Sequence, residues 1–309
     1  MPNIAYIRKR ELELEVDFKG SESQAILAMS SVRFVAYDED RDVYRALPCV
    51  YWELKNRLTL FGFKVETEIN EDTGLGFEIL RKSVALRDYQ ENIMRSLRRK
   101  NFRGVVVLPT GAGKSIIGSQ AIRELKQRTL IVVPTVELMH QWRTKIRKHL
   151  GPPDNAIGMW GGGRRSLGDI TITTYQSACR REFLMVAMDR FNLIIFDETH
   201  HLPAETYIEI AKRLTAWHRI GLTATPERID RRDRLLPIFV GDLIYGAGMR
   251  ELIRRGHLAR YEYEKIRIDM SDEERETYRR LMKIYRSYVR ENFPKLRGRE
   301  AFELSLIHI

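Results

Sequence analysis

The sequence contains few cysteines and no long apolar run, and both absences exclude classes of protein. Its 309 residues include two cysteines, Cys49 and Cys179, whose separation provides neither a disulfide framework nor the spacing of zinc ligands. We expect each to be a small buried side chain in a protein of the reducing cytosol. No stretch is long and apolar enough to cross a bilayer, and the first residues carry no secretory signal. We therefore expect a cytoplasmic protein of prokaryotic type without a membrane partner.

The charged residues are distributed unevenly along the chain. The formal net charge is +11, but residues 1–80 alone carry −5 and residues 81–309 carry +16. An acidic segment beside a basic body suggests two structural units, and it puts any phosphate-binding surface mostly after residue 80. Apolar residues make up 43% of the chain, which is enough for a sizeable core.

Residues 1–80 are expected to form a small α+β domain. Residues 11–18 alternate polar and apolar side chains as a half-buried strand does, and residues 32–37 suit a second strand. Residues 45–62 carry apolar side chains closer to helical spacing. The turn formers of residues 70–76 predict a linker.

After residue 80, short apolar runs alternate with helical patterns, which is typical of a parallel sheet covered by helices on both faces. In such sheets ligands bind at the carboxyl ends of the strands. We assign this α/β domain to residues 81–260. The apolar runs are residues 105–108, 130–133, 170–172, 193–196 and 220–222.

From residue 271 the chain becomes helical and basic. Residues 278–299 contain eight Lys and Arg residues, with apolar and aromatic side chains at helical intervals. We expect an amphipathic helix with a solvated charged face, and a nucleic-acid contact is the alternative. The last six residues are apolar and carry no helix stop signal, which suggests a truncated end.

The string Leu-Pro-Thr-Gly-Ala-Gly-Lys-Ser at residues 108–115 follows an apolar run and precedes a helical pattern, as a phosphate-binding loop requires. Its first residue is Leu where a strict P-loop has Gly. Gly111 and Gly113 can turn backbone N–H groups toward an anion at the helix N-terminus. Lys114 is expected to contact the β- and γ-phosphates, and the Ser115 hydroxyl is expected to bind Mg²⁺. The predicted phosphate-contacting residues are Thr110, Gly111, Ala112, Gly113, Lys114 and Ser115.

An acidic pair, Asp197 and Glu198, ends another apolar run. The Asp197 carboxylate can hold Mg²⁺ through its water shell, and Glu198 can take the proton of an attacking water. Alone, such a pair is usually a solvated strand end. Together with the lysine-bearing loop, it predicts a site for ATP and Mg²⁺.

Further polar residues follow or precede the predicted strands. Gln90 opens a helical pattern and could contact adenine through its amide, although a surface glutamine is an equal alternative. Pro134, Thr135 and Thr174 follow two other runs and could grip phosphates, or they could form ordinary turns. Thr223 and Thr225 follow the fifth run, and their hydroxyls could couple the acidic pair to a nucleic acid.

The order of these strings resembles that of superfamily 2 helicases, and most closely that of the XPB type in its short archaeal and bacterial forms. The resemblance implies a RecA-like fold for residues 81–260, a P-loop NTPase sheet with helices on both faces. It implies a small damage-recognition-like domain at residues 1–80 and the start of a helical thumb at residues 261–309. The resemblance depends on residues 86–90, 108–115, 132–135, 173–176, 197–201, 221–226 and 256–259.

The resemblance also implies roles for single residues. Arg87 and Gln90 would lie at the adenine, while His200 and Thr223 would relay between nucleotide and DNA. Two adjacent histidines without nearby cysteines do not favour a transition-metal site at His200 and His201. The implied catalytic residues are Glu198, Lys114 and His200, and the implied Mg²⁺ ligands are Ser115 and Asp197.

One string departs from the family pattern. XPB relatives carry Arg-Glu-Asp shortly after Thr-Ala-Thr, whereas this chain has Arg228, Ile229 and Asp230. The missing carboxylate affects whatever the middle residue does in unwinding. Arg228 and Asp230 remain as expected nucleic-acid contacts.

Superfamily 2 motors also need a second RecA-like domain, which supplies arginine fingers and which this sequence lacks. We therefore expect a fragment that binds ATP–Mg²⁺ and DNA but hydrolyses ATP poorly. Its expected partners are DNA, the second RecA-like domain and a nuclease or a repair or transcription factor, at the nucleoid. A restriction-type, ResIII-like translocase is the alternative within the motor class. A non-catalytic DNA-binding fragment is the alternative outside it.

Overall fold

The structure is a computed structural model that describes residues 3–81, 84–225, 232–246, 248–259, 264, 266 and 268–292. The chain divides into two compact units, Met1–Leu258 and Ala259–Ile309. The first unit contains two sheets, and the second contains the helix α11 (Asp272–Asn292), which confirms the predicted helix after residue 271. No helix in the described ranges combines the length and the apolar character needed to cross a membrane.

The smaller sheet is formed by the first 67 residues. Its strand order is β3-β4-β2-β1-β5, in which β1 and β5 are parallel and the other neighbours are antiparallel. Alternate residues of the central strands, among them Ile7 and Leu14, are fully buried in a core that they share with Leu54 and Leu58. The elements are β1 (Ile4–Arg10), β2 (Glu13–Lys19), α1 (Glu22–Ser30), β3 (Val35–Asp38), β4 (Val43–Ala46), α2 (Tyr51–Leu60) and β5 (Lys64–Thr67).

The predicted helix over residues 45–62 is wrong in its first part. Its first two residues belong to β4, and the α-helix begins at Tyr51. Leu47 is extended, with φ −71° and ψ 139°, as the residue before a proline prefers, and Pro48 opens a 3₁₀ turn. The proline therefore separates a strand from a helix that share similar apolar spacing. The predicted strands over residues 11–18 and 32–37 correspond to β2 and β3.

The larger sheet has eight strands in the order β13-β6-β12-β11-β7-β10-β8-β9, all parallel except for the β8–β9 pair. The five predicted runs coincide with β6, β7, β10, β11 and β12, which confirms the α/β parallel-sheet class. The strands are β6 (Arg103–Val107), β7 (Thr129–Val133), β8 (Ile157–Gly161), β9 (Arg164–Arg165), β10 (Ile170–Thr174), β11 (Leu193–Asp197), β12 (His218–Thr223) and β13 (Leu243–Gly246).

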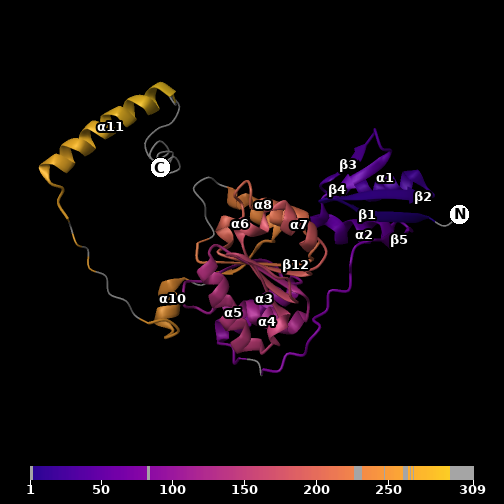
Figure 1. The fold of residues 1–309 in the computed structure, drawn as a ribbon, viewed down its shortest axis with the longest axis horizontal. Coiled ribbons are helices and arrows are strands. Elements are labelled where there is room, and N and C mark those ends of the chain that lie inside the picture. The colour runs from indigo at the N-terminus through magenta and orange to yellow at the C-terminus, as the bar shows by residue number, and fades with distance from the viewer. Residues whose placement is uncertain are drawn as a thin grey trace. The chain divides into compact units, whose positions relative to one another are not determined.

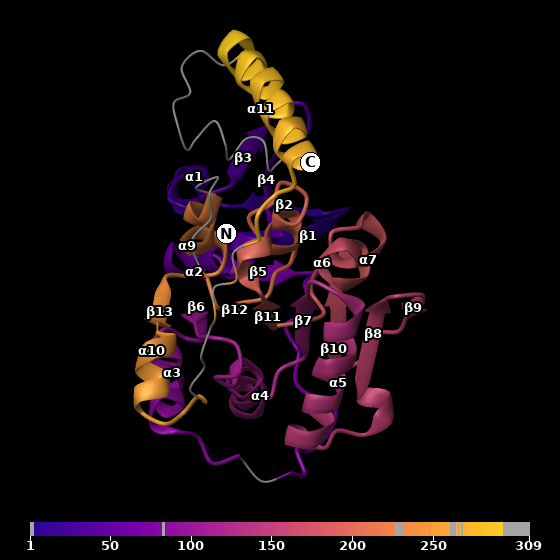
Figure 2. The ribbon, with the colours of Figure 1, turned by 90° about the vertical axis from the view of Figure 1, so that its left-hand side faces the viewer.

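Helices cover both faces of this sheet (Figure 1). One apolar core joins Ile131 of β7 to Ile117 and Trp142 on one face, and another joins Leu130 to Phe183 on the other. The strands that the sequence did not predict, β8, β9 and β13, lie at the two edges (Figure 2). The helices are α3 (Asp88–Arg99), α4 (Lys114–Leu125), α5 (Val136–Leu150), α6 (Tyr175–Ala178), α7 (Arg181–Ala187), α8 (Ile208–Arg213), α9 (Leu236–Phe239) and α10 (Met249–Arg254).

A buried carboxylate links the smaller sheet to the larger one. One oxygen of Asp189, Oδ2, accepts hydrogen bonds from Lys9 Nζ at 2.6 Å and from the backbone N–H of Asn70 at 2.8 Å. Asp189 is 8% exposed, so water cannot easily replace these donors.

We expect Asp189→Asn to lower the free energy of unfolding by about 1–2 kcal/mol, because it weakens two charge-assisted hydrogen bonds. Urea denaturation followed by circular dichroism measures the loss. Glu182→Gln is the matched control, because Glu182 pairs with Arg165 at 2.6 Å while both side chains are more than half exposed. An equal effect of the two substitutions would show that the burial of Asp189 contributes nothing.

Candidate functional site

The strand order brings the lysine-bearing loop and the acidic pair to one edge of the larger sheet. β12 lies between β6 and β11, with Thr223 beside Val107 of β6 and Leu222 beside Asp197 of β11. Because all three strands are parallel, their carboxyl ends meet at the same edge. The loop after β6, the end of β12 and the acidic pair therefore lie next to one another.

The loop needs glycine at two positions. Gly111 has φ +82° and Gly113 has φ +87°, both in the left-handed region that favours glycine. A methyl group on Gly113 would lie 2.4 Å from Nε2 of Gln90, so a side chain has no room there. Gly113 is also the N-cap of α4, whose first N–H groups lack intrahelical partners and suit an anion.

Side chains of helix α3 form hydrogen bonds with the backbone of the loop. The Tyr89 hydroxyl and Gln90 Nε2 both donate to the carbonyl oxygen of Ala112, at 2.7 Å and 3.2 Å. Gln90 is 2% exposed, and its Oε1 accepts from the backbone N–H of Arg87 at 3.0 Å. The alternative of a surface glutamine is therefore wrong. The Arg87 guanidinium donates to the carbonyl of His257 at 2.7 Å.

Lys114 and Glu198 form an ion pair across the end of β12, with Nζ 2.6 Å from Oε1. Both side chains are mostly buried, at 13% and 26% exposure. Glu198 has φ +46°, which is uncommon outside glycine and is often found where function requires strain. Two of the three predicted catalytic residues, Lys114 and Glu198, are therefore in direct contact.

Asp197 is held by two donors. Trp142 Nε1 donates to its Oδ2 at 2.7 Å, and the backbone N–H of Glu198 donates to its Oδ1 at 3.1 Å. Burial raises the pKa of Asp197 above its usual value, while the indole hydrogen bond opposes this shift by favouring the charged form. No sequence pattern predicts this role for Trp142, because an apolar helix face gives no signal that distinguishes this tryptophan from an ordinary core residue.

The two predicted coupling residues and His200 form one hydrogen-bonded group. His200 Nδ1 lies 3.0 Å from Thr223 Oγ1 and 3.5 Å from Glu198 Oε2. Thr223 Oγ1 also accepts from the backbone N–H of Thr225 at 3.2 Å. Within the described ranges, no three His, Cys, Asp or Glu side chains gather closely enough to hold a metal ion.

Of the predicted nucleic-acid contacts, two are helix N-caps. Thr135 Oγ1 accepts from Leu138 N at 3.3 Å at the start of α5, and Thr174 Oγ1 accepts from Ser177 N at 3.2 Å at the start of α6. Pro134 directly precedes Thr135, and β7 and β10 are neighbours, so all three residues lie at the same sheet edge. Arg228 and Asp230 lie outside the described residues.

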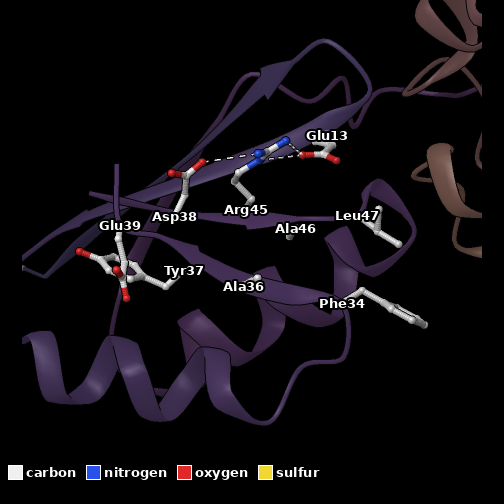
Figure 3. A pocket seen from close by; sticks show the side chains of 9 residues that line it. All are labelled: Glu13, Phe34, Ala36, Tyr37, Asp38, Glu39, Arg45, Ala46 and Leu47. Carbon is white, nitrogen blue, oxygen red and sulfur yellow. Dashed lines mark hydrogen bonds and ion pairs between the residues drawn. The ribbon is translucent and has the colours of Figure 1, made fainter. Parts of the chain in front are cut away.

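A concave feature lies on the smaller sheet. It is a hollow of about 520 Å³ in which Arg45 is held between Glu13 and Asp38 (Figure 3). Its other charged lining residue, Glu39, is also acidic. Because three acidic residues surround one arginine, this hollow does not suit a phosphate. The phosphate-binding character remains with the larger sheet.

The residues at the larger sheet's edge fit a magnesium-bound nucleotide. The glycine cradle and the N-terminus of α4 suit phosphate oxygens, and Lys114 adds a positive charge. Ser115 lies in the first turn of α4, and a hydroxyl with a carboxylate such as Asp197 is the oxygen donor set that Mg²⁺ prefers.

Comparisons with known proteins agree with this chemistry. Residues 83–228 match the family model "ResIII: Type III restriction enzyme, res subunit". The chain is 35% identical to the DNA 3'-5' translocase XPB2 of Sulfurisphaera tokodaii, over 92% of this chain and 62% of the relative. It is also 35% identical to the DNA 3'-5' helicase XPB of Mycobacterium tuberculosis, over 62% of this chain and 36% of the relative. The chain thus spans between one third and two thirds of these relatives' length.

Among solved structures, this chain is similar to the helicase domain of Pyrococcus furiosus Hef. The similar region covers 67% of this chain and 46% of the Hef chain, with 23% sequence identity and a TM-score of 0.49. The restriction-type alternative is not better supported than the XPB type, because the XPB2 relative covers more of the chain than the res-subunit model does.

Proposed function

We propose that this chain, which is similar to XPB-type DNA helicases and translocases, is the ATP-binding and DNA-contacting part of an ATP-dependent DNA translocase. The observation that supports this most strongly is the contact between Lys114 and Glu198 at the shared end of three parallel strands. In this proposal residues 81–260 form the ATP-binding domain, residues 1–80 a small damage-recognition-like domain and residues 261–309 the start of a helical thumb. The polarity in the relatives' names, 3'-5', is the polarity that we propose here.

In this proposal the site residues have different roles in ATP hydrolysis. Lys114 and the loop N–H groups, from Thr110 to Ser115, bind and orient the phosphates. Bound Mg²⁺ supplies positive charge against the phosphate oxygens, and Ser115 and Asp197 would hold it. Glu198 accepts a proton from the attacking water through its carboxylate. In this structure, Oε1 of that carboxylate accepts a hydrogen bond from Lys114. Arg87 and Gln90 lie at the adenine side of the loop.

The DNA side of the proposal uses the same sheet edge. Pro134, Thr135 and Thr174 contact the phosphate backbone. Arg228 and Asp230, which lie outside the described residues, are further proposed nucleic-acid contacts. His200 responds to the state of Glu198, whose Oε2 lies 3.5 Å from its Nδ1. Hydrogen bonds from His200 to Thr223 and from Thr225 to Thr223 carry this response further. The second RecA-like domain, and a nuclease or a repair or transcription factor, complete the proposed set of partners.

Lys114→Ala tests the nucleotide site. We expect the substitution to weaken binding of a non-hydrolysable ATP analogue with Mg²⁺ by about tenfold to a hundredfold, because a charge-assisted contact is lost. Isothermal titration calorimetry gives the affinity, and the ligand-induced rise in melting temperature should shrink in parallel. Lys148→Ala on the exposed end of α5 is the control and should bind as the unaltered chain does.

The non-catalytic alternative makes a different prediction. If the nucleotide site served only as a folding element, DNA affinity measured by fluorescence anisotropy would be the same with and without the analogue. The motor proposal requires the two ligands to influence each other's affinity, because binding linkage is reciprocal.

A further inference from the structure

The indole of Trp142 connects two parts of the proposed site that are distant in the sequence. Trp142 lies in α5, and its Nε1 donates to Oδ2 of Asp197 at 2.7 Å. Both side chains are buried, Trp142 at 1% exposure and Asp197 at 7%. A hydrogen bond to a charged group in such a place is shielded from competition by water.

The same indole is packed closely against the helix that carries the phosphate-binding residues. A methyl group on Gly118 of α4 would lie only 2.8 Å from Cη2 of Trp142, so the glycine makes room for the ring. The ring therefore contacts α4 and Asp197 together. Its position is set by packing, and its N–H direction is set with it.

The hydrogen bonds of Asp197 leave capacity for a cation. Each carboxylate oxygen receives one donor, Trp142 on Oδ2 and the Glu198 backbone on Oδ1. A carboxylate has about four acceptor positions, so about two remain for a metal ion or its water shell. Two donors on the two oxygens also prevent rotation of the carboxylate about its Cβ–Cγ bond.

We propose that Trp142 is a positioning residue that holds the Asp197 carboxylate in the orientation from which it binds Mg²⁺. This inference depends on the proposed function, since it concerns the same nucleotide site. Outer donors of this kind fix a metal-binding side chain, and removing one typically weakens metal binding by about 10–100-fold. Trp142 also ties this carboxylate to α5, the helix that begins directly after Thr135.

The first experiment observes the indole directly in the unaltered chain. The sequence contains four tryptophans, so a ¹H–¹⁵N correlation spectrum should contain four indole signals, and Trp142→Phe identifies the one from Trp142. With the ATP analogue saturating, we expect added Mg²⁺ to shift this signal and to leave that of Trp217, at the opposite end of β12, unchanged. A Trp142 signal that ignores Mg²⁺ would overturn the inference.

The second experiment measures the Mg²⁺ concentration at which half of the analogue is bound. Trp142→Phe keeps a large apolar ring and removes the donor, and we expect this midpoint to rise about tenfold. Binding of the analogue in EDTA should not change, which separates a metal effect from a damaged fold. Trp217→Phe is the matched control and should leave both quantities unchanged.

The outcomes distinguish the inference from the function on which it depends. If the unaltered chain shows no Mg²⁺-dependent nucleotide binding, the proposed function fails and the inference fails with it. If the unaltered chain binds as expected and Trp142→Phe has the same Mg²⁺ midpoint, the inference alone is wrong. If Trp142→Phe does not fold, single Phe substitutions of Trp52, Trp160 and Trp217 assign the other three indole signals, and the remaining signal of the unaltered chain decides.

Discussion

Purified on its own, this 309-residue chain should hydrolyse ATP at no more than about 0.01 turnovers per second, even with saturating single-stranded DNA. These 309 residues contain one lysine-bearing loop and one acidic pair, and they span 62% of the length of the XPB2 relative. Arginine fingers from a second RecA-like domain, which is the partner that we propose, contribute roughly 10³–10⁵ in rate in well-studied phosphoryl-transfer systems. A phosphate-release assay over several hours measures turnover in this range.

Glu198→Gln is the control that assigns the residual rate to this site. The substitution keeps the size of the side chain and removes the proton acceptor, so the slow rate should fall by a further factor of about 10²–10⁴. A DNA-stimulated rate of roughly one turnover per second by the unaltered chain would contradict the prediction, because such a rate lies within the usual range of complete enzymes.

Arg219→Met should destabilise the larger sheet by about 4 kcal/mol. Arg219 is 1% exposed, and burial lowers its pKa to about 10, so it remains charged at neutral pH. The guanidinium donates four hydrogen bonds of 2.7–2.9 Å to backbone carbonyls near the ends of α8 and α9. The acceptors are Ala211, Leu214, Ala216 and Phe239.

The expected loss is large because methionine fills most of the volume and satisfies none of these carbonyls. Buried acceptors without donors cost about 1–3 kcal/mol each, and carbonyls at helix ends also lose a favourable positive charge. Urea denaturation gives the change in the free energy of unfolding. Arg99→Met, at the exposed end of α3, is the matched control and should change stability by less than about 0.5 kcal/mol. Equal stability of the two variants would show that the buried network is unimportant.

Periodicity and composition were sufficient for most of the larger sheet. Strands buried on both faces are continuous apolar runs, and this local signal does not depend on their neighbours. All five predicted runs became parallel strands, with bounds close to those expected. The edge strands gave weaker signals, since β8 contains two glycines and β9 has two residues. In the smaller domain, a strand followed by a helix has the apolar spacing of one longer helix. Pro48, which opens a 3₁₀ turn, separates the two elements.

The lysine-bearing loop and the acidic pair were likewise visible in the sequence, because each follows an apolar run and the two strings occur together. That the loop and the pair lie close together in space was only an expectation. The order of the strands in the sheet determines this proximity, and that order depends on how the helices pack on the two faces, which no local sequence pattern records. β12 between β6 and β11 sets the distance at which Lys114 reaches Glu198.

The amino-acid sequence by itself therefore determined the fold class, and it predicted the ligand and the charged residues that we propose to bind it. The tertiary structure alone decided the burial of Gln90 beneath the loop, the indole donor of Asp197 and the carbonyl partners of Arg219. The physical reason is the same in each case. The sequence gives the chemical type of each side chain. Its hydrogen-bond partner belongs to a segment that is distant in the sequence, and only the packing of the folded chain brings the two together.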